Sequence, residues 1–313
     1  MIWQKLILFL TSLIMLIPAA NAEGIGMVTG SKIGTYFRFG NDIAGIAKTV
    51  GLDIEVKESK GSVDNIERMT SKENAAFGIV QSDVLGWLSR SGDPEKRRIA
   101  DRMRLIFPFY NEEVHLFANK RIQSFKDLEG KRLSVGEEGS GHWLTATNLL
   151  GIMGVKPDTT LHMKAEEAAA EVLLGHLDAM IFVGGKPIPA FARFEQLKKD
   201  PKYAPHFQDI HFVPLNDPLL LQEYQVGTIG PDDYPWLDKT IPTIAVKAVL
   251  MSFDFSNQTS AYYKQRCQEL AKLGRALHRN IDGLRQNGHP KWKEVNLDQS
   301  VGIWKLDACS RTH

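Results

Sequence analysis

A serine and a histidine lie two positions apart in residues 136–144, GEEGSGHWL. A hydroxyl near an imidazole is the pairing that nucleophilic catalysis uses. The strand-to-helix turn of serine hydrolases, however, reads G-x-S-x-G, and here Glu138 and His142 occupy the two glycine positions around Ser140. The spacing therefore disfavours a hydrolase, and an exported enzyme that uses Ser140 and His142 is kept only as an alternative.

The glycines of the same stretch do not form a nucleotide-binding loop. A phosphate-binding loop needs a lysine after its last glycine, and a dinucleotide fingerprint needs the spacing G-x-G-x-x-G. Gly136, Gly139 and Gly141 meet neither condition. The nine histidines are scattered, and no H-E-x-x-H or C-x-x-C motif occurs. We expect neither a cofactor nor a metal site.

Composition excludes several classes of partner. The chain of 313 residues is 43% hydrophobic and 24% charged, as in an ordinary globular protein, and its 38 basic residues nearly balance 37 acidic ones. The sequence contains no basic run of the kind that binds nucleic acid.

Residues 1–22 combine Lys5, a long apolar run and the small residues AANA, which is typical of a cleaved signal peptide. We expect a periplasmic protein that does not span the membrane after cleavage.

The chain contains two cysteines, Cys267 and Cys309. In an oxidising compartment such a pair is expected to form a disulfide that ties the C-terminal tail to a helix. Spacing alone does not show that the two residues meet, so two unpaired thiols remain the alternative.

Four short apolar runs each lead into small polar residues and then into a helical pattern: GIGMV into TGSKIGTY, DIEVKES into KGSVDNIERM, AAFGIV into QSDVLGWL, and KRLSV into GEEGSGHWL. This alternation predicts an α/β fold. The apolar face of the first helix is expected to comprise Phe39, Ile43, Ile46 and Val50. The fourth helix is expected to end at Gly154 and to bury Trp143, Ala146, Leu150 and Met153.

Each of these four loops begins a helix, whose first N–H groups have no partners within the helix. In an open α/β sheet, such loops gather at the carboxyl edge of the strands, where ligands bind. The four loops together therefore predict a site for a small anion such as a carboxylate. Alternatively, their Ser, Thr, Asp and Gly residues only cap the helices.

Two extended segments, RLIFPFYNEEVHLFANK and TIAVKAVLMSFDF, are longer than a usual strand. Such segments suit a chain that leaves one lobe and enters another. About 130 residues lie between them, enough for a second α/β lobe. We expect lobe 1 to comprise residues 23–112 and 246–313, and lobe 2 to comprise residues 113–245.

Ordered motifs along the mature chain resemble TAXI proteins, the extracytoplasmic solute-binding subunits of TAXI-type TRAP transporters. They are TGSKIGTYFRFG, KGSVDNIERM, FGIVQSDV, LIFPFYNEEVHLFA, IQSFKDLEGKRLSVGEEGSGH, GHLDAMIFVGGKPIPA, IPTIAVKAVL and GHPKWKEVNL. The resemblance implies a two-lobed periplasmic-binding-protein fold of the class II type, with a mixed sheet in each lobe and two hinge strands. It also implies a monomer, a TRAP membrane permease as partner, and a glutamate-like or 2-oxoglutarate-like ligand.

The resemblance places the ligand between the lobes. Backbone N–H groups and the hydroxyls of Thr35, Ser62 and Ser140 would bind a carboxylate. Tyr36 and Phe182 would pack on its apolar part, and Asp83 would hold an ammonium group. Alternatively, Asp83 caps its helix and the two rings belong to the core. The expected contacts are Thr29, Gly30, Thr35, Tyr36, Gly61, Ser62, Asn65, Gln81, Ser82, Asp83, His115, Ser140, Gly141, Phe182, Val183, Gly184 and Pro187.

Three charged residues, Glu137, Glu138 and Lys32, depart from the family pattern. Glu137 and Glu138 stand before Gly139, where uncharged residues are usual, and would repel an anion unless they point to solvent or Lys186 offsets them. Lys32 lies in the first glycine loop, where an uncharged residue is usual. Lys32 and Lys186 are therefore candidate ligand contacts, with solvated surface as the alternative. Three other functions stay open: a receptor for a different transporter or a sensor kinase, the exported enzyme, and a structural or adhesive protein.

Overall fold

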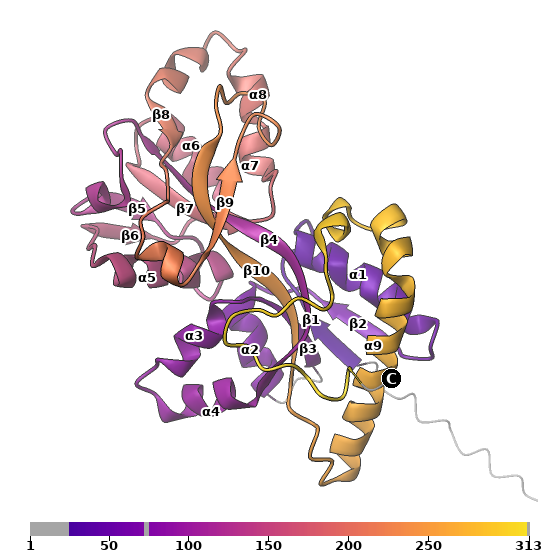
Figure 1. Cartoon of the computed structure of the whole chain (residues 1–313). Helices are drawn as coiled ribbons and strands as arrows, with labels where there is room; N and C mark the ends of the chain where they lie inside the picture. The colour runs from indigo at the N-terminus through magenta and orange to yellow at the C-terminus, as the bar shows by residue number, and fades with distance from the viewer. Residues whose placement is uncertain (1–24, 72–74, 312–313) are drawn as a thin grey trace, which may run out of the picture.

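The computed structural model describes residues 25–71 and 75–311. The expected signal peptide, residues 1–22, lies outside the described residues. Figure 1 shows two lobes of strands and helices, joined by the long strands β4 (Met103–Asn119) and β10 (Ile241–Phe253). The α/β fold and the two crossover segments agree with the prediction from the sequence.

Lobe 1 contains parallel strands whose carboxyl ends lead into helices. Its first elements are β1 (Ile25–Val28), α1 (Thr35–Lys48), β2 (Ile54–Lys57), α2 (Ser62–Thr70), β3 (Ala75–Gln81), α3 (Val84–Ser89) and α4 (Pro94–Arg102). β1 lies between β2 and β3 and is parallel to both. Phe39 and Ile43 of α1 are fully buried and Ile46 is partly buried, so the apolar spacing predicted the inner face of this helix.

Lobe 2 repeats the alternation with shorter elements. They are η1 (Phe125–Leu128), β5 (Arg132–Ser134), α5 (Gly141–Met153), β6 (Thr159–Leu161), α6 (Ala165–Leu173), β7 (Ala179–Gly184), α7 (Pro189–Ala192), α8 (Phe194–Leu197), η2 (Ala204–Gln208), β8 (Ile210–Phe212), η3 (Leu220–Gln222) and β9 (Gln225–Ile229), where η marks a 3-10 helix. α5 ends at Gly154, as predicted, because this residue has the left-handed conformation, with φ of 64°, that closes a helix.

β4 and β10 join the lobes by pairing with each other in antiparallel fashion. Their register runs from Phe253 opposite Met103 to Ala245 opposite Glu113. In lobe 2, β4 pairs with β7 and β10 pairs with β9. The mixed sheets of the two lobes are thus continuous. Eight strands follow the order β2-β1-β3-β10-β4-β7-β5-β6, and β8 on β4 and β9 on β10 complete one ten-stranded sheet.

The buried apolar side chains form separate clusters on either side of the crossover. One cluster draws almost entirely on residues 25–109 and 248–309. Two others draw on residues 114–246. This distribution agrees with two lobes, and the boundaries 112/113 and 245/246 stay a prediction.

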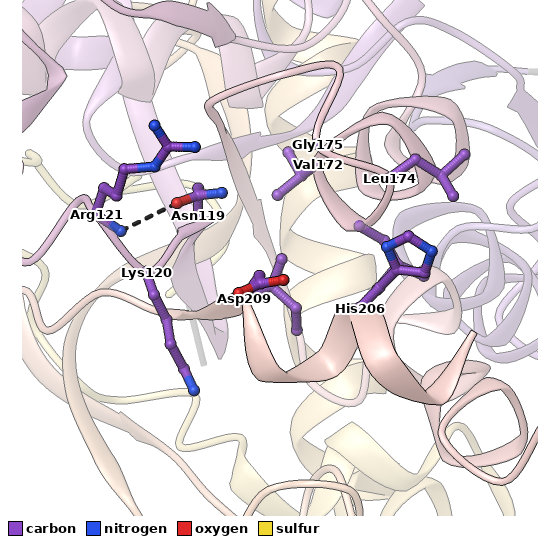
Figure 2. Close-up of a pocket in the computed structure, with 10 residues that line it drawn as sticks. Asn119, Lys120, Arg121, Val172, Leu174, Gly175, His206 and Asp209 are labelled. Carbon is purple, nitrogen blue, oxygen red and sulfur yellow. Dashed lines mark hydrogen bonds between the residues drawn. The ribbon is translucent and has the colours of Figure 1, made fainter. Parts of the chain in front are cut away.

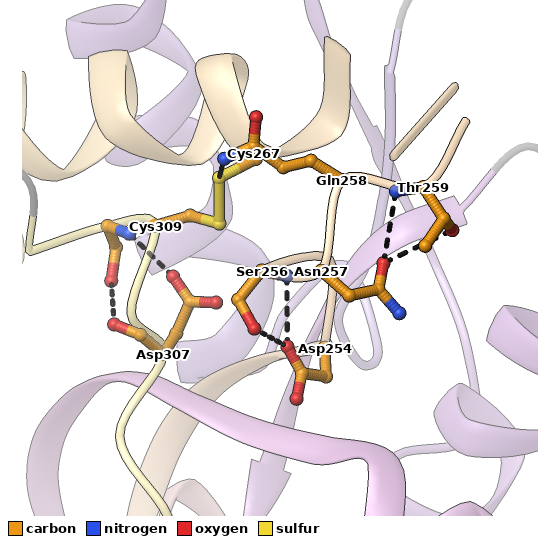
Figure 3. Close-up of a disulfide and its surroundings, with 9 residues drawn as sticks. Asp254, Ser256, Asn257, Gln258, Thr259, Cys267, Asp307 and Cys309 are labelled. Carbon is orange, nitrogen blue, oxygen red and sulfur yellow. Dashed lines mark hydrogen bonds between the residues drawn. A yellow bond between two sulfur atoms is a disulfide. The ribbon is translucent and has the colours of Figure 1, made fainter. Parts of the chain in front are cut away.

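The C-terminal segment covers lobe 1 with the long helix α9 (Ala261–Asn287) and the short helix η4 (Pro290–Glu294). Trp292 is fully buried and stacks on Phe39 of α1 with 4.3 Å between ring centroids. A disulfide joins Cys267 on α9 to Cys309 in the tail (Figure 3). Between these anchors, the indole Nε1 of Trp304 donates a hydrogen bond to the carbonyl oxygen of Ser82 at 2.8 Å.

Among residues 25–71 and 75–311, no helix is both long enough and apolar enough to cross a membrane. Within the same ranges, no group of three or more His, Cys, Asp and Glu side chains is arranged to hold a metal ion.

Removal of the disulfide is expected to lower the stability of lobe 1. The bond closes a loop with a sequence separation of 42 residues, for which loop entropy predicts a loss of about 4 kcal/mol in the free energy of unfolding. Urea denaturation of the double variant Cys267→Ser/Cys309→Ser measures this loss. Dithiothreitol should destabilise the native protein by a similar amount and leave the double variant unaffected; equal stability of the two proteins would contradict the expectation.

Candidate functional site

The loops at the carboxyl ends of the strands in lobe 1 directly touch the start of α5 in lobe 2. The backbone N–H of Asp64 donates to the carbonyl oxygen of Gly139 at 3.2 Å. A Cβ atom added to Gly61 would lie 3.4 Å from the backbone nitrogen of Gly141. A Cβ atom added to Gly141 itself would lie 2.2 Å from Oε1 of Gln81. A side chain at position 141 would therefore have to displace the side chain of Gln81.

Asp83 connects the two lobes through its side chain. Its Oδ2 atom accepts hydrogen bonds from the hydroxyl of Thr145 at 2.8 Å and the hydroxyl of Tyr224 at 3.3 Å, and Nδ2 of Asn148 lies at 3.5 Å. These three partners belong to lobe 2. Asp83 precedes α3 but makes no side-chain cap of that helix. The capping alternative is therefore wrong, and the oxygen expected to hold an ammonium group binds lobe 2 instead.

Two further pairs extend this contact along α3. The rings of Trp87 and Trp143 meet edge to face with 6.2 Å between centroids. The guanidinium of Arg90 lies 3.1 Å from a carboxylate oxygen of Glu223. Because one member of each pair comes from each lobe, the structure represents a closed arrangement on this side of the crossover.

Glu112, on β4 at the point where the lobes join, is a polar residue that the sequence analysis missed. It is 5% exposed, and the hydroxyl of Tyr36 donates to its Oε2 atom at 2.8 Å. Burial raises the pKa of Glu112 to about 7 and that of Asp83 to about 6. The signal in the sequence was two adjacent acids, Glu112 and Glu113, inside an otherwise apolar strand.

Several residues expected to contact a ligand form hydrogen bonds that tie the strands of lobe 1 together. Nδ2 of Asn65 donates to the carbonyl oxygens of Thr29 and Ile79, both at 2.7 Å. The hydroxyl of Ser62 accepts from the backbone N–H of Gln81 at 2.9 Å. The hydroxyl of Thr29 donates to the carbonyl of Lys57, and Gly30 accepts from the N–H of Ser59. These bonds hold the carboxyl ends of β1, β2 and β3 in fixed positions.

The serines at two other loops have backbone partners. The hydroxyl of Ser82 accepts from the N–H of Lys247 at 3.0 Å, and the hydroxyl of Ser140 accepts from the N–H of Trp143 at 3.2 Å as the cap of α5. α1 begins after Gly34, which provides no side-chain cap, and its first turn carries no acid. Thr35, at the start of α1, is half-buried. The start of α1 thus keeps N–H groups available for an anion.

His115 does not lie where the sequence analysis expects it. It is fully buried in lobe 2, where its Nδ1 atom lies 2.9 Å from the carbonyl oxygen of Glu113 and its Nε2 atom lies 2.9 Å from the hydroxyl of Tyr234. Its ring stacks on Phe191. Burial lowers the pKa of His115 to about 3. Both ring nitrogens therefore have protein partners, and His115 is a core residue.

Ser140 and His142 do not form the catalytic pair considered as an alternative. Nδ1 of His142 lies 2.7 Å from the carbonyl oxygen of Val183, and its ring stacks on Phe182 with 4.0 Å between centroids. Burial lowers the pKa of His142 to about 4. Phe182 is half-buried, and Gly184 follows it at the end of β7. Among the hydrogen bonds of the described residues, none joins Ser140 to His142.

The four charged residues proposed to influence specificity are either exposed or paired within the protein. Glu137, Glu138 and Lys32 are exposed, and Lys32 lies 3.6 Å from the carboxylate of Glu58. Lys186 is bound within lobe 2, where its Nζ atom lies 2.9 Å from Oδ2 of Asp233. Lys186 therefore does not offset the two glutamates.

Pro187, an expected ligand contact, is exposed to solvent. Nothing in its surroundings assigns it to the surface between the lobes.

Two surface cavities lie apart from the interlobe loops. Figure 2 shows one of about 420 Å³ in lobe 2, between the end of α6 and η2, with Lys120, Arg121, His206 and Asp209 around it. The other, of about 490 Å³, lies in lobe 1 among α4, the end of β10 and the start of α9. Neither contains any of the expected ligand contacts.

A family model described as the NMT1-like family matches residues 27–302. The chain belongs to the NMT1-like family.

The solved structures similar to this member of the NMT1-like family include a product of Candida albicans, CA3427, described as having the generic periplasmic binding protein fold. It is 14% identical, with a TM-score of 0.49 over 91% of this chain and 85% of that one. The periplasmic sulfonate-binding protein SsuA from Methylobacillus flagellatus KT is 12% identical, with a TM-score of 0.47 over 85% and 70%. A histidine kinase sensor domain similar to periplasmic binding proteins is 11% identical, with a TM-score of 0.48 over 88% and 98%. At these identities the likeness says nothing about the ligand.

The buried acids predict how stability depends on pH. The pKa values of Asp83 and Glu112 are raised in the folded protein, so the native state binds more protons than the unfolded chain between about pH 4 and pH 7. The contribution of each acid to the free energy of unfolding is fully present below its unfolded pKa and is lost as the pH rises through its folded pKa. This contribution is at most about 3 kcal/mol for each group.

Glu112→Gln tests this dependence, because it keeps the shape of the side chain and removes the charge. Thermal unfolding should show the variant more stable than the native protein near pH 8 and no more stable near pH 5. The exposed acid Glu67 on α2 provides the control Glu67→Gln, which should leave the pH profile unchanged. A profile of Glu112→Gln parallel to that of the native protein would contradict the assignment.

Proposed function

We propose that this protein is an extracytoplasmic solute-binding receptor of a TAXI-type TRAP transporter. It captures a small carboxylate or amino acid between its two lobes and delivers it to the membrane permease. The observation that carries the proposal is the direct meeting of glycine-rich helix starts from both lobes, at Gly61 and Gly141, beside the strands that join the lobes. Membership of the NMT1-like family is consistent with it.

The proposed closing motion takes place at the β4–β10 pair. These two strands are the elements of regular structure that cross from one lobe to the other. Relative rotation of the lobes about them would separate Asp83 from Thr145 and Tyr224 and expose the buried polar groups. A ligand entering this space would then be enclosed by the contacts that form on closure.

The start of α1 is the proposed anion site. It combines uncapped N–H groups with the half-buried hydroxyl of Thr35, and Tyr36 follows directly. The half-buried ring of Phe182 is proposed to cover the apolar part of the ligand from lobe 2.

The same proposal includes a monomeric protein, a periplasmic location and the permease as partner. The alternative is that the protein serves a different transporter or a sensor kinase. A pull-down with the membrane proteins encoded beside its gene distinguishes these recipients.

Ligand binding is expected to raise the melting temperature of the mature protein. A ligand at about 100 times its Kd stabilises the native state by about 2.7 kcal/mol, which corresponds to a shift of about 5 °C or more. Differential scanning fluorimetry with dicarboxylates, 2-oxo acids and amino acids measures the shift. A complete panel without any shift would contradict the proposed function.

Gly141→Ala should abolish this shift while leaving each lobe folded. The added Cβ atom would lie 2.2 Å from Oε1 of Gln81 and 2.9 Å from the hydroxyl of Ser62, so closure would be blocked. Gly151→Ala on the same helix is the matched control, because its Cβ atom would have no neighbour within 4 Å. Normal ligand binding by Gly141→Ala would show that closure at α5 is not required.

A further inference from the structure

The cavity of about 490 Å³ in lobe 1 has the size and lining of a small-molecule site. Its walls come from α4 and the start of α9, at the end of lobe 1 that points away from lobe 2 (Figure 1). Buried apolar side chains line it, namely Met69, Phe253 and Phe255, together with the half-buried Ile99. The cavity is therefore apolar at its base and lies apart from the surface between the lobes.

Aromatic rings form one side of this cavity. Phe255 meets Tyr263 edge to face with 5.2 Å between ring centroids, and meets Tyr262 in the same way at 5.8 Å. The guanidinium of Arg266 lies 5.5 Å from the ring centroid of Tyr262, which helps to hold this ring in place. Tyr262 is nevertheless 55% exposed. An apolar ring entering the cavity would cover exposed aromatic surface.

A cation, Arg102 of α4, is fixed at the same cavity. Its Nη2 atom donates to the hydroxyl of Tyr263 at 3.2 Å, and its guanidinium lies 5.2 Å from the ring centroid of Phe253. Among the described residues, Arg102 forms no ion pair with a carboxylate, Asp101 included. A guanidinium has five N–H donors, so one bond to Tyr263 leaves donors for an anion.

The acids closest to the cavity along the chain have other partners. Glu95, which also lines the cavity, pairs with Arg98. Asp254, between the two phenylalanines of the lining, pairs with Arg104 at 2.5 Å. Arg102 is thus a positive charge that the neighbouring acids leave without a counter-charge.

We propose that this cavity is a binding site for a small aromatic carboxylate. The carboxylate binds the guanidinium of Arg102, whose planar donors suit the two oxygens of such a group. The aromatic ring packs against Phe255 and Tyr262, because aromatic pairs favour offset and edge-to-face contacts. A simple anion would leave the rings uncovered, and a neutral ring would leave Arg102 without an acid. The site is separate from the one between the lobes and does not depend on the proposed function.

Three matched compounds test the proposal by isothermal titration and saturation-transfer NMR on the mature, disulfide-bonded protein. They are 3-phenylpropionate, its neutral amide 3-phenylpropionamide, and propionate, which lacks the ring. One molecule of 3-phenylpropionate should bind per protein, with a Kd of about 0.1 to 1 mM. The amide and propionate should each bind about 10-fold more weakly or less, because each lacks one of the two contacts.

Two variants assign the binding to this cavity. Arg102→Gln removes the guanidinium and should weaken the binding of 3-phenylpropionate by about 10-fold or more. Arg97→Gln is the matched control on the same helix, because Arg97 is exposed and bonds the carbonyl oxygen of Ser91. This control should bind as tightly as the native protein. Gly141→Ala, which alters the contact between the lobes, should also retain full affinity for 3-phenylpropionate.

Several outcomes would overturn the proposal. They are an absence of binding, equal binding of the amide or of propionate, and full affinity in Arg102→Gln. Loss of binding in Gly141→Ala would place the compound between the lobes, which agrees with the proposed function and overturns this inference. Should Arg102→Gln not fold, Tyr262→Ser replaces an exposed ring of the same cavity, and unchanged affinity in that variant would contradict the site.

Discussion

The antiparallel pairing of β4 with β10 is the constraint on which the rest of this structure depends. Each strand is long enough to serve both lobes, and the register from Met103–Phe253 to Glu113–Ala245 fixes where one lobe ends and the other begins. That register also sets the position of Glu112 and Glu113 between the lobes. The hydrogen-bonded ladder makes the connection stiff along the strands. Among the described residues, no other helix or strand crosses between the lobes, so bending of the β4–β10 pair is the deformation of lowest cost.

The contact between the lobes is unusual in its polarity. Closure buries acids, and their desolvation opposes it, whereas the bonds from Thr145 and Tyr224 to Asp83 favour it. These effects oppose each other in the closure of the empty protein. A ligand that adds even a few hydrogen bonds can then shift the balance between open and closed forms.

Much of the fold could be predicted because it depends on local patterns. The inner face of α1 followed from apolar spacing, Gly154 followed from helix-closing chemistry, and the crossover strands followed from their length. The expected pair of cysteines is joined. The functions of single polar residues were harder to predict, because they depend on neighbours that are distant in sequence. Asn65 binds β1 and β3, and His115 binds Tyr234 at a separation of 119 residues. Glu112 lies within a strand, whereas the pattern that predicted the site consists of helix starts.

The bond from Trp304 to Ser82 makes the tail of the chain part of the surface between the lobes, since Ser82 directly precedes Asp83. Lobe 2 is formed by one uninterrupted stretch, whereas lobe 1 needs β10, α9 and this tail, all from the last quarter of the sequence. For a chain that emerges from its N-terminus, lobe 2 can therefore fold while lobe 1 is still incomplete. The surface between the lobes would then form only after β10, α9 and the segment up to Cys309 have joined lobe 1.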